Sequence, residues 1–150
     1  MKPIVLIFED SEILRSTLES ILIGLGFEVF TFSDPGMCPL CALGDSICPL
    51  NHACSDIIIS DVNMPTKSGL EFIKERLDNG CKSKCRALMS ANWSDTDLQK
   101  AQEFGCRIFH KPFNLVELLD WLKDCGKRIE SERELSDWFA SPKQQQRKLG

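Results

Sequence analysis

The sequence predicts a single α/β domain in which a parallel sheet is covered by helices on both faces. Short apolar runs of strand character alternate along the chain with segments whose apolar residues recur at helical spacing. Several of the strand-like runs also end in polar side chains. With 150 residues, of which 43% are hydrophobic and 27% charged, the chain has room for one ordinary domain and not for a second.

Five runs are expected to form the strands. The third has the apolar character of a buried strand, Asp56-Ile57-Ile58-Ile59-Ser60, and leads directly into a turn at Asp61. The full set is residues 3–8, 27–32, 56–60, 86–89 and 107–110.

Four helices are expected, starting near Ser11, Ser68, Ser94 and Asn114. Ser94 with Asp97, and Asn114 with Glu117, have the spacing of helix N-caps with capping-box partners. The inward residues of the first helix are expected to be Leu14, Leu18, Ile21 and Leu25. Those of the last helix are expected to be Leu115, Leu118, Leu119 and Leu122.

Polar side chains follow four of the expected strands. They are Glu9 with Asp10, Asp61, Ser90 and Lys111. The carboxyl ends of parallel strands meet at one edge of a sheet, so these residues are expected to form one polar pocket. Singly, each has a plainer interpretation, as a turn cap, a helix cap or a surface lysine. Their joint occurrence favours a functional site at this edge of the sheet.

The acids of this pocket predict a divalent cation. Clustered carboxylates repel one another, and a bound cation relieves that repulsion. Mg²⁺ prefers oxygen ligands and few protein carboxylates. We therefore expect Asp10 and Asp61 as direct ligands and Glu9 as a ligand through water.

The same residues resemble the receiver domain of bacterial two-component response regulators. The resemblance runs from about Lys2 to about Lys127 and rests on Glu9-Asp10, Asp61, Met64-Pro65, Gly69, Ser90-Ala91 and Lys111-Pro112. It implies a flavodoxin-like, CheY-like fold with strand order 2-1-3-4-5.

The resemblance also implies roles for the site residues. Asp61 would accept a phosphoryl group from a histidine kinase or a phosphotransfer protein. The backbone carbonyl of Asn63 would complete the Mg²⁺ site. Ser90 would hydrogen-bond the phosphoryl group, and Lys111 would supply a fixed positive charge.

One position departs from the family pattern. The family usually carries a Tyr or Phe switch at the position of Ile108, and this chain contains no Tyr. Phe109 is adjacent but is expected to point to the other face of its strand. The usual aromatic switch is therefore not expected at this position.

The segment of residues 34–55 is rich in cysteine and is interrupted by Pro and Gly, so it is expected to replace or extend the second helix. Its thiols are Cys38, Cys41, Cys48 and Cys54, with His52 as an alternative ligand. Four such ligands suit Zn²⁺ or an iron–sulfur cluster. The alternative is four reduced cysteines in an irregular loop.

The expected organisation is a receiver domain over residues 1–128, then a helical extension and a disordered tail over residues 129–150. A formal net charge of −4 gives no general attraction to nucleic acid. The N-terminal apolar run is too short for a signal peptide or a membrane span. The protein is accordingly expected in the cytoplasm, with no nucleic acid or membrane as partner.

The leading functional hypothesis is a stand-alone response regulator that is not an enzyme and that signals to a downstream protein through phosphorylation of Asp61. A second is a metal or redox sensor built on the cysteine segment. A third is a haloacid-dehalogenase-like phosphohydrolase. That third family places a second aspartate two residues after its nucleophile, where this chain has Asn63, so it is disfavoured.

Overall fold

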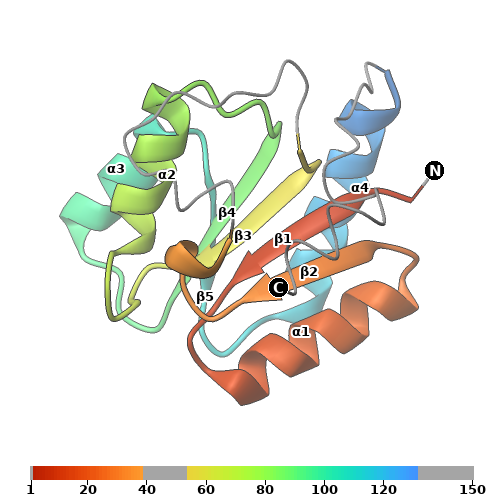
Figure 1. Ribbon diagram of the computed structural model, residues 1–150, viewed down its shortest axis with the longest axis horizontal. Coiled ribbons are helices and arrows are strands. Elements are labelled where there is room, and N and C mark those ends of the chain that lie inside the picture. Colours follow the sequence, from red (N-terminus) through yellow and green to blue (C-terminus); the bar gives the residue numbers. More distant parts are fainter. Residues whose placement is uncertain (1, 39–53, 132–150) are drawn as a thin grey trace.

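A computed structural model describes residues 2–38 and 54–131, which form a five-stranded parallel sheet flanked by helices (Figure 1). The strand order is β2-β1-β3-β4-β5, which confirms the order that the resemblance to receiver domains implies. The strands are β1 (Ile4–Phe8), β2 (Glu28–Phe32), β3 (Ile57–Asp61), β4 (Cys85–Ser90) and β5 (Arg107–His110). The helices are α1 (Glu12–Gly24), α2 (Gly69–Asp78), α3 (Asp95–Glu103) and α4 (Leu115–Ser131), with a 3-10 turn at Pro35–Met37.

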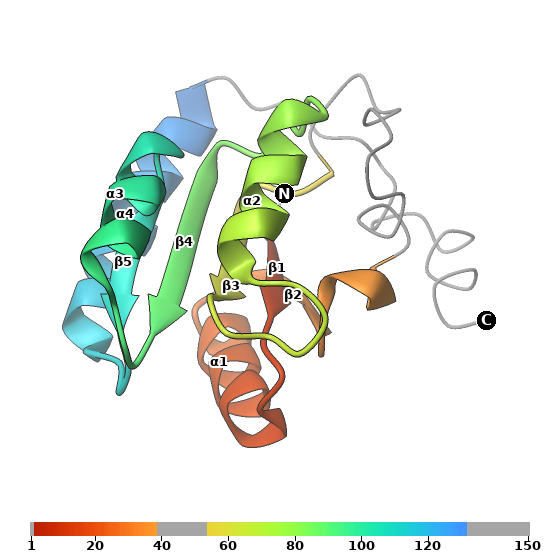
Figure 2. The same ribbon diagram turned by 90° about the vertical axis from the view of Figure 1, so that its left-hand side faces the viewer.

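The helices form a layer on each face of the sheet, with α1 and α4 on one face and α2 and α3 on the other (Figures 1 and 2). Alternate residues of each strand enter opposite cores because strand side chains alternate in direction. In β1, Leu6 packs in the core under α2 and α3, whereas Ile7 packs in the core under α1 and α4. Burial of both faces explains why β1 is wholly apolar and why β3 begins with three isoleucines.

Side-chain caps start the helices where the sequence places them. The hydroxyl of Ser94 accepts a hydrogen bond from the backbone N–H of Asp97, and Ser68 does the same for Glu71. The carboxamide of Asn114 accepts from the backbone N–H groups of Val116 and Glu117. These bonds satisfy N–H groups that the first helical turn leaves without partners.

Two residues expected to face inward are exposed. Leu25 is 48% exposed and is the C-cap of α1, one residue after the last helical residue, Gly24. Leu22 is buried in the last turn instead. Leu115 is 49% exposed at the first position of α4, ahead of the turns that pack on the sheet through Leu118, Trp121 and Leu122.

Between β2 and β3 the described residues contain only the 3-10 turn, which Asp34 caps by accepting from the N–H of Gly36. The rest of this connection, residues 39–53, and the C-terminal residues 132–150 lie outside the described part of the chain. The expectations for the cysteine segment and for the tail therefore stay predictions. Within the described ranges, no helix is both long and apolar enough to cross a membrane.

Candidate functional site

Three acids meet at the carboxyl edge of the sheet. Glu9 and Asp10 follow β1, and Asp61 ends β3, the strand that pairs with β1. One carboxylate oxygen from each lies within 4.8 Å of the other two. Glu9 and Asp61 are buried and Asp10 is exposed, so the group opens to solvent on one side. Three oxygen donors with an open side fit the hard, partly hydrated coordination that Mg²⁺ prefers.

Lys111 joins this acidic group from the end of β5. Its Nζ lies 3.1 Å from Asp61 Oδ2 and 3.1 Å from Glu9 Oε2. Burial alone would lower the pKa of Lys111, but its hydrogen bonds to Asp61 and Glu9 and their charges raise that pKa above its ordinary value. The ammonium therefore stays charged at the pocket. The peptide bond between Lys111 and Pro112 is cis.

Glu9 is anchored through both its side chain and its backbone, whereas its neighbour Asp10 is exposed. Its carboxylate accepts a hydrogen bond from the backbone N–H of Ser11, and its backbone carbonyl accepts one from the guanidinium of Arg15. Burial and the nearby charge of Asp61 raise the pKa of Glu9 to about 7, against the opposing effect of Lys111. Glu9 can therefore hold a proton near neutral pH in the metal-free protein.

The two oxygens of Asp61 have different partners. Oδ1 accepts a hydrogen bond from the backbone N–H of Asn63 at 3.2 Å, which is the turn-capping role considered from the sequence. Oδ2 faces Lys111. Turn capping and a place in the polar pocket are therefore compatible.

Ser90 lies at the end of β4, fully buried beside the turn that follows Asp61. Its Oγ accepts hydrogen bonds from the backbone N–H of Asn92 at 3.0 Å and from the carboxamide of Asn63 at 3.4 Å. The side chain of Asn63 thus links the β3 and β4 ends of the site. This contact is separate from the metal-ligand role expected of the Asn63 carbonyl, which stays a prediction.

The predicted cysteine site is only partly within the described residues. Cys38 is fully buried and Cys54 half-buried, and both pack on the core under α2 and α3. Cys41, Cys48 and His52 lie outside the described residues. In residues 2–38 and 54–131, the group of three or more potential metal ligands is the trio Glu9, Asp10 and Asp61.

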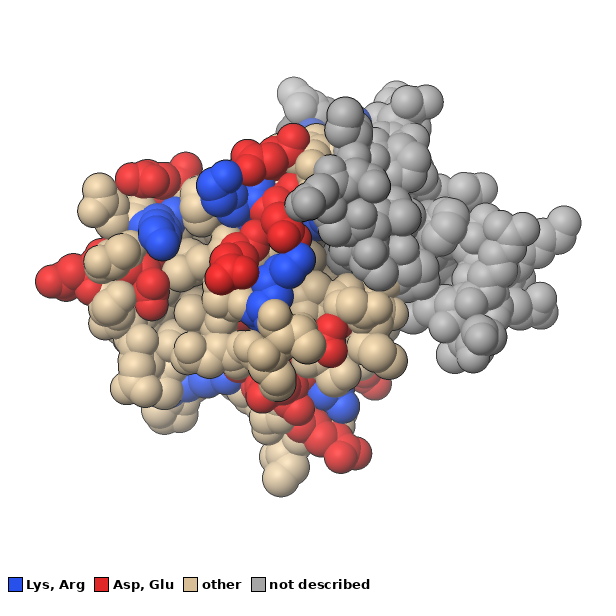
Figure 3. All heavy atoms as spheres, turned by 60° about the vertical axis from the view of Figure 1, so that its left-hand side comes forward, with Lys and Arg blue, Asp and Glu red and all other residues tan. Residues whose placement is uncertain are grey.

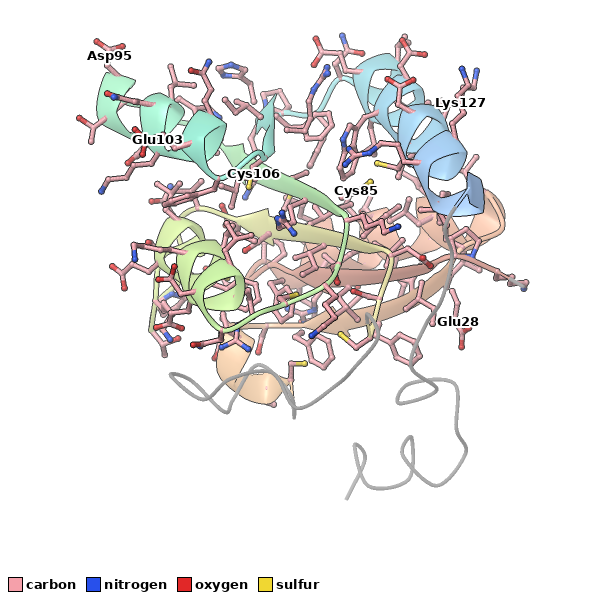
Figure 4. The ribbon with its side chains drawn as sticks, turned by 90° about the horizontal axis from the view of Figure 1, so that it is seen from above. Glu28, Cys85, Asp95, Glu103, Cys106 and Lys127 are labelled. Atoms are coloured by element: carbon pink, nitrogen blue, oxygen red, sulfur yellow. The ribbon has the colours of Figure 1, made fainter. Side chains whose placement is uncertain are left out.

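Two further cysteines lie at the opposite edge of the sheet and pack there as small apolar residues. Cys85 begins β4 and packs in the core under α1 and α4, whereas Cys106 precedes β5 and packs toward the core under α2 and α3 (Figure 4). A hydrogen bond with Cys125 lowers the pKa of the Cys85 thiol to about 7. Burial raises the pKa of Cys106 to about 11.

Comparison with known proteins decides the family. The family model of the response regulator receiver domain matches residues 5–123. The chain belongs to the response regulator receiver family. The chemotaxis protein CheY4 of Vibrio cholerae is similar to this receiver domain, with 31% identity and a TM-score of 0.66 over 83% of this chain and 99% of that one. The family is one of phosphoacceptor signalling domains.

Other solved structures share the receiver fold. The N-terminal domain of an uncharacterized protein from Wolinella succinogenes is 26% identical, with a TM-score of 0.70 over 88% of this chain and all of that one. A receiver protein from Pseudomonas putida, at 18% identity, also has a TM-score of 0.70, over 83% of this chain and 98% of that one. No curated protein sequence matches this receiver domain significantly.

Two residues that hydrogen-bond to members of this pocket were not predicted from the sequence. Arg15, one turn into α1, anchors the carbonyl of Glu9. Asn92 supplies the N–H that holds the Ser90 hydroxyl. No sequence pattern predicts either contact, because each depends on the path of the chain after the end of its strand.

Proposed function

We propose that this receiver domain is a phosphorylation switch in which Asp61 accepts a phosphoryl group from a phosphohistidine. The observation that carries the proposal is the position of Lys111, whose ammonium lies 3.1 Å from both Asp61 and Glu9. The proposal is supported by a cation that lies beside the buried carboxylate of Asp61 and beside an acidic group suited to a metal. Phosphoryl transfer needs these components and little else from a protein.

In the proposed step, Asp61 Oδ2 attacks phosphorus and the bond between phosphorus and the donor histidine nitrogen breaks. The electron pair of that bond leaves on the imidazole. Lys111 neutralises charge on the transferred group, and the Ser90 hydroxyl donates to one of its oxygens. Because Oδ1 of Asp61 is held by the N–H of Asn63, Oδ2 is the oxygen positioned to react.

Glu9, Asp10 and Asp61, with the carbonyl of Asn63, are proposed to hold Mg²⁺. The donors are oxygen atoms with an exposed side at Asp10, which fits a cation that keeps several waters. The chemistry that bound Mg²⁺ supplies is neutralisation of negative charge on the acids and on the phosphoryl oxygens. Zn²⁺ or an iron–sulfur cluster remains a proposal for the cysteine segment alone.

The proposed donor is a histidine kinase or a phosphotransfer protein in the cytoplasm, and the proposed output is binding to another protein. Charge on the described surface supports a protein rather than nucleic acid as partner. Lys74 pairs with Asp78 and Lys67 with Glu75 along α2. On the face that Figure 3 shows, basic side chains are interspersed with acidic ones rather than gathered in one area.

Intact mass spectrometry tests the proposal. Wild-type protein incubated with Mg²⁺ and acetyl phosphate should gain the mass of one phosphoryl group, and EDTA should prevent the gain. Asp61→Asn should gain none and retain the wild-type far-UV circular dichroism. Asp95→Asn, an exposed acid at the start of α3, is the matched control and should behave as wild type. A phosphorylated Asp61→Asn protein would overturn the assignment.

A further inference from the structure

Two cysteine thiols lie together between α4 and the amino end of β4. Cys85 is the first residue of β4, and Cys125 lies on the side of α4 that packs on the sheet. Both side chains are buried in the core under α1 and α4, and a hydrogen bond joins the two thiols. Figure 4 shows Cys85 beneath α4. The residues are far apart in the sequence, so the packing of α4 on the sheet is what brings them together.

Neighbouring contacts hold α4 against β4 at this place. The guanidinium of Arg128, three residues after Cys125, donates a hydrogen bond of 3.3 Å to the carbonyl oxygen of Lys84, the residue before Cys85. Ile129, one turn after Cys125, is buried in the same core. The two thiols are therefore held where their hydrogen bond can form. Hydrogen-bonded thiols point toward each other, which is also what a disulfide requires of two cysteines.

The surroundings of the pair favour the thiolate form of Cys85. Its hydrogen bond with Cys125 has the largest effect, and the guanidinium groups of Arg128 and Arg86 act in the same direction. The pKa of Cys85 is thereby lowered to about 7, although burial and the charge of Asp56 oppose the shift. The hydrogen bond with Cys85 and burial raise the pKa of Cys125. Cys85 is therefore the thiol of this pair that ionises first, and the thiolate is the nucleophilic form of cysteine.

Open space adjoins the pair at the edge of the sheet. Lys84 and Arg128, which are bonded to each other beside the two cysteines, are both exposed. Gly126 follows Cys125 in α4, and a Cβ added at Gly126 would meet no atom within 4 Å. The pair is thus close to solvent although its own side chains are buried. A small, uncharged oxidant suits such a site better than a protein thiol, which needs an exposed sulfur to attack.

We propose that Cys85 and Cys125 form a redox-active dithiol, which hydrogen peroxide converts into a disulfide between β4 and α4. In the first step the Cys85 thiolate attacks one peroxide oxygen and the O–O bond breaks. This step leaves a sulfenic acid on Cys85 and a hydroxide, which takes up a proton to become water. In the second step the sulfur of Cys125 attacks the sulfur of Cys85, the S–O bond breaks, and the departing hydroxide leaves as water with the Cys125 proton. The two thiols lose two electrons, and the peroxide is reduced to two molecules of water.

The disulfide fastens α4 to the sheet. In the reduced protein the two side chains are linked by a bond between thiols, which are weak donors and acceptors. A disulfide has a specific geometry and restricts the segments that it joins, so the second half of α4 opens more rarely. Cys85 pairs with Ile57 at the start of β3, whereas Asp61 ends that strand. The disulfide therefore leaves the proposed phosphorylation site free, and this inference does not depend on that function.

Peptide mapping of the full chain tests the proposal. Reduced protein is treated with hydrogen peroxide, its remaining thiols are blocked with iodoacetamide, and it is digested with trypsin in the absence of reductant. The fragments that contain Cys85 and Cys125 should be recovered as one disulfide-linked species, which dithiothreitol separates. In protein unfolded by urea this link should form at least about tenfold more slowly, because closure of the chain must then precede it.

Variants and hydrogen exchange complete the test. Cys85→Ser and Cys125→Ser should each lose the linked species, whereas Cys106→Ser, at the same edge of the sheet, should form it as wild type does. Oxidation should slow amide exchange from Trp121 to Ile129 at least about fivefold in wild type and not in Cys85→Ser.

Two results would overturn the proposal, and both are read on the wild-type protein, so they do not depend on the folding of a variant. One is the absence of a link between Cys85 and Cys125 after oxidation. The other is a sulfinic acid on Cys85 while Cys125 keeps a free thiol. Unchanged amide exchange in the linked protein would overturn the restraint on α4.

Discussion

The α-carbon of Gly69 lies so close to Asp61 that a Cβ there would be 2.1 Å from the Asp61 carbonyl oxygen. Gly69 begins α2, and its N–H donates to the carbonyl of Val62, which locks the helix start against the site. Because the obstructing atom belongs to the backbone, it has no side-chain rotation with which to move away. A glycine at this position therefore lets α2 approach the strand that carries Asp61, the proposed phosphoacceptor.

Gly69→Ala should lower the free energy of unfolding by about 1–3 kcal/mol, as overpacking typically does, and should slow phosphorylation by displacing Asp61. Urea denaturation and intact-mass time courses measure the two effects. Gly126→Ala within α4 is the control, since nothing lies within 4 Å of its added Cβ, and it should stabilise by about 0.5–1 kcal/mol. Equal stability of Gly69→Ala and wild type would contradict the close approach.

Lys111→Met should have opposite effects on metal binding and on phosphorylation. Removing a cation 3.1 Å from Asp61 and Glu9 leaves the acids more negative, so Mg²⁺ affinity should be equal or higher. Phosphorylation by acetyl phosphate should slow by about a hundredfold, since charge on the transferred group loses its partner. Calorimetric titration measures the Mg²⁺ affinity, and time courses of intact mass measure the rate of phosphorylation. Lys123→Met, on exposed α4 surface, should change neither.

Substitutions of Asp10 and Ser90 should differ in their effect on the affinity for Mg²⁺. Asp10→Ala removes a carboxylate from the acidic group and should weaken Mg²⁺ affinity by about tenfold or more. Ser90→Ala removes no charge and should leave Mg²⁺ affinity within about twofold of wild type, although it should disturb the phosphorylated state. Both are measured by titration with Mg²⁺. Wild-type affinity in Asp10→Ala would rule out direct ligation.

The raised pKa of Glu9 predicts a pH dependence of stability in metal-free protein. Burial and Asp61 raise this pKa from 4.5 to about 7, so between these values the folded state holds a proton that the unfolded state has lost. The contribution of Glu9 to stability is therefore present in full below pH 4.5 and is lost as the pH rises to about 7. Urea midpoints in EDTA should fall over this range, and less steeply in Glu9→Gln. Glu103→Gln, an exposed acid on α3, should keep the wild-type slope.

The cysteine segment is expected to carry one metal centre per chain, either Zn²⁺ or an iron–sulfur cluster. Elemental analysis of anaerobically purified protein should find stoichiometric zinc or iron, and Cys41→Ser should lose it while remaining phosphorylated on Asp61. Cys81→Ser is the matched control, since Cys81 lies outside the segment. Wild-type protein without either metal, and with titratable thiols in the segment, would establish the alternative of reduced cysteines.

The helix starts and the clustering of the acids at one edge of the sheet could be predicted from the sequence. The capping bonds of Ser94 and Asn114 span two or three residues, so a local pattern is enough to predict them. The approach of Glu9 to Asp61 follows from a parallel sheet whose neighbouring strands end at the same edge. The exposure of Leu25 and Leu115 was not predictable from helical spacing, because spacing does not fix where a helix ends.

By itself, the sequence determined the α/β class, the five strands and the set of polar residues at the edge of the sheet, because periodicity and strand ends are local properties. Only the tertiary structure decided which oxygen of Asp61 faces Lys111, how strongly burial raises the pKa of Glu9, and that the Trp93 indole bonds the Phe109 carbonyl. Lys111 and Glu9 are 102 residues apart in sequence, and Trp93 and Phe109 are 16 apart. Such contacts depend on packing of whole elements and on the low polarity that packing creates, which no short stretch of sequence contains.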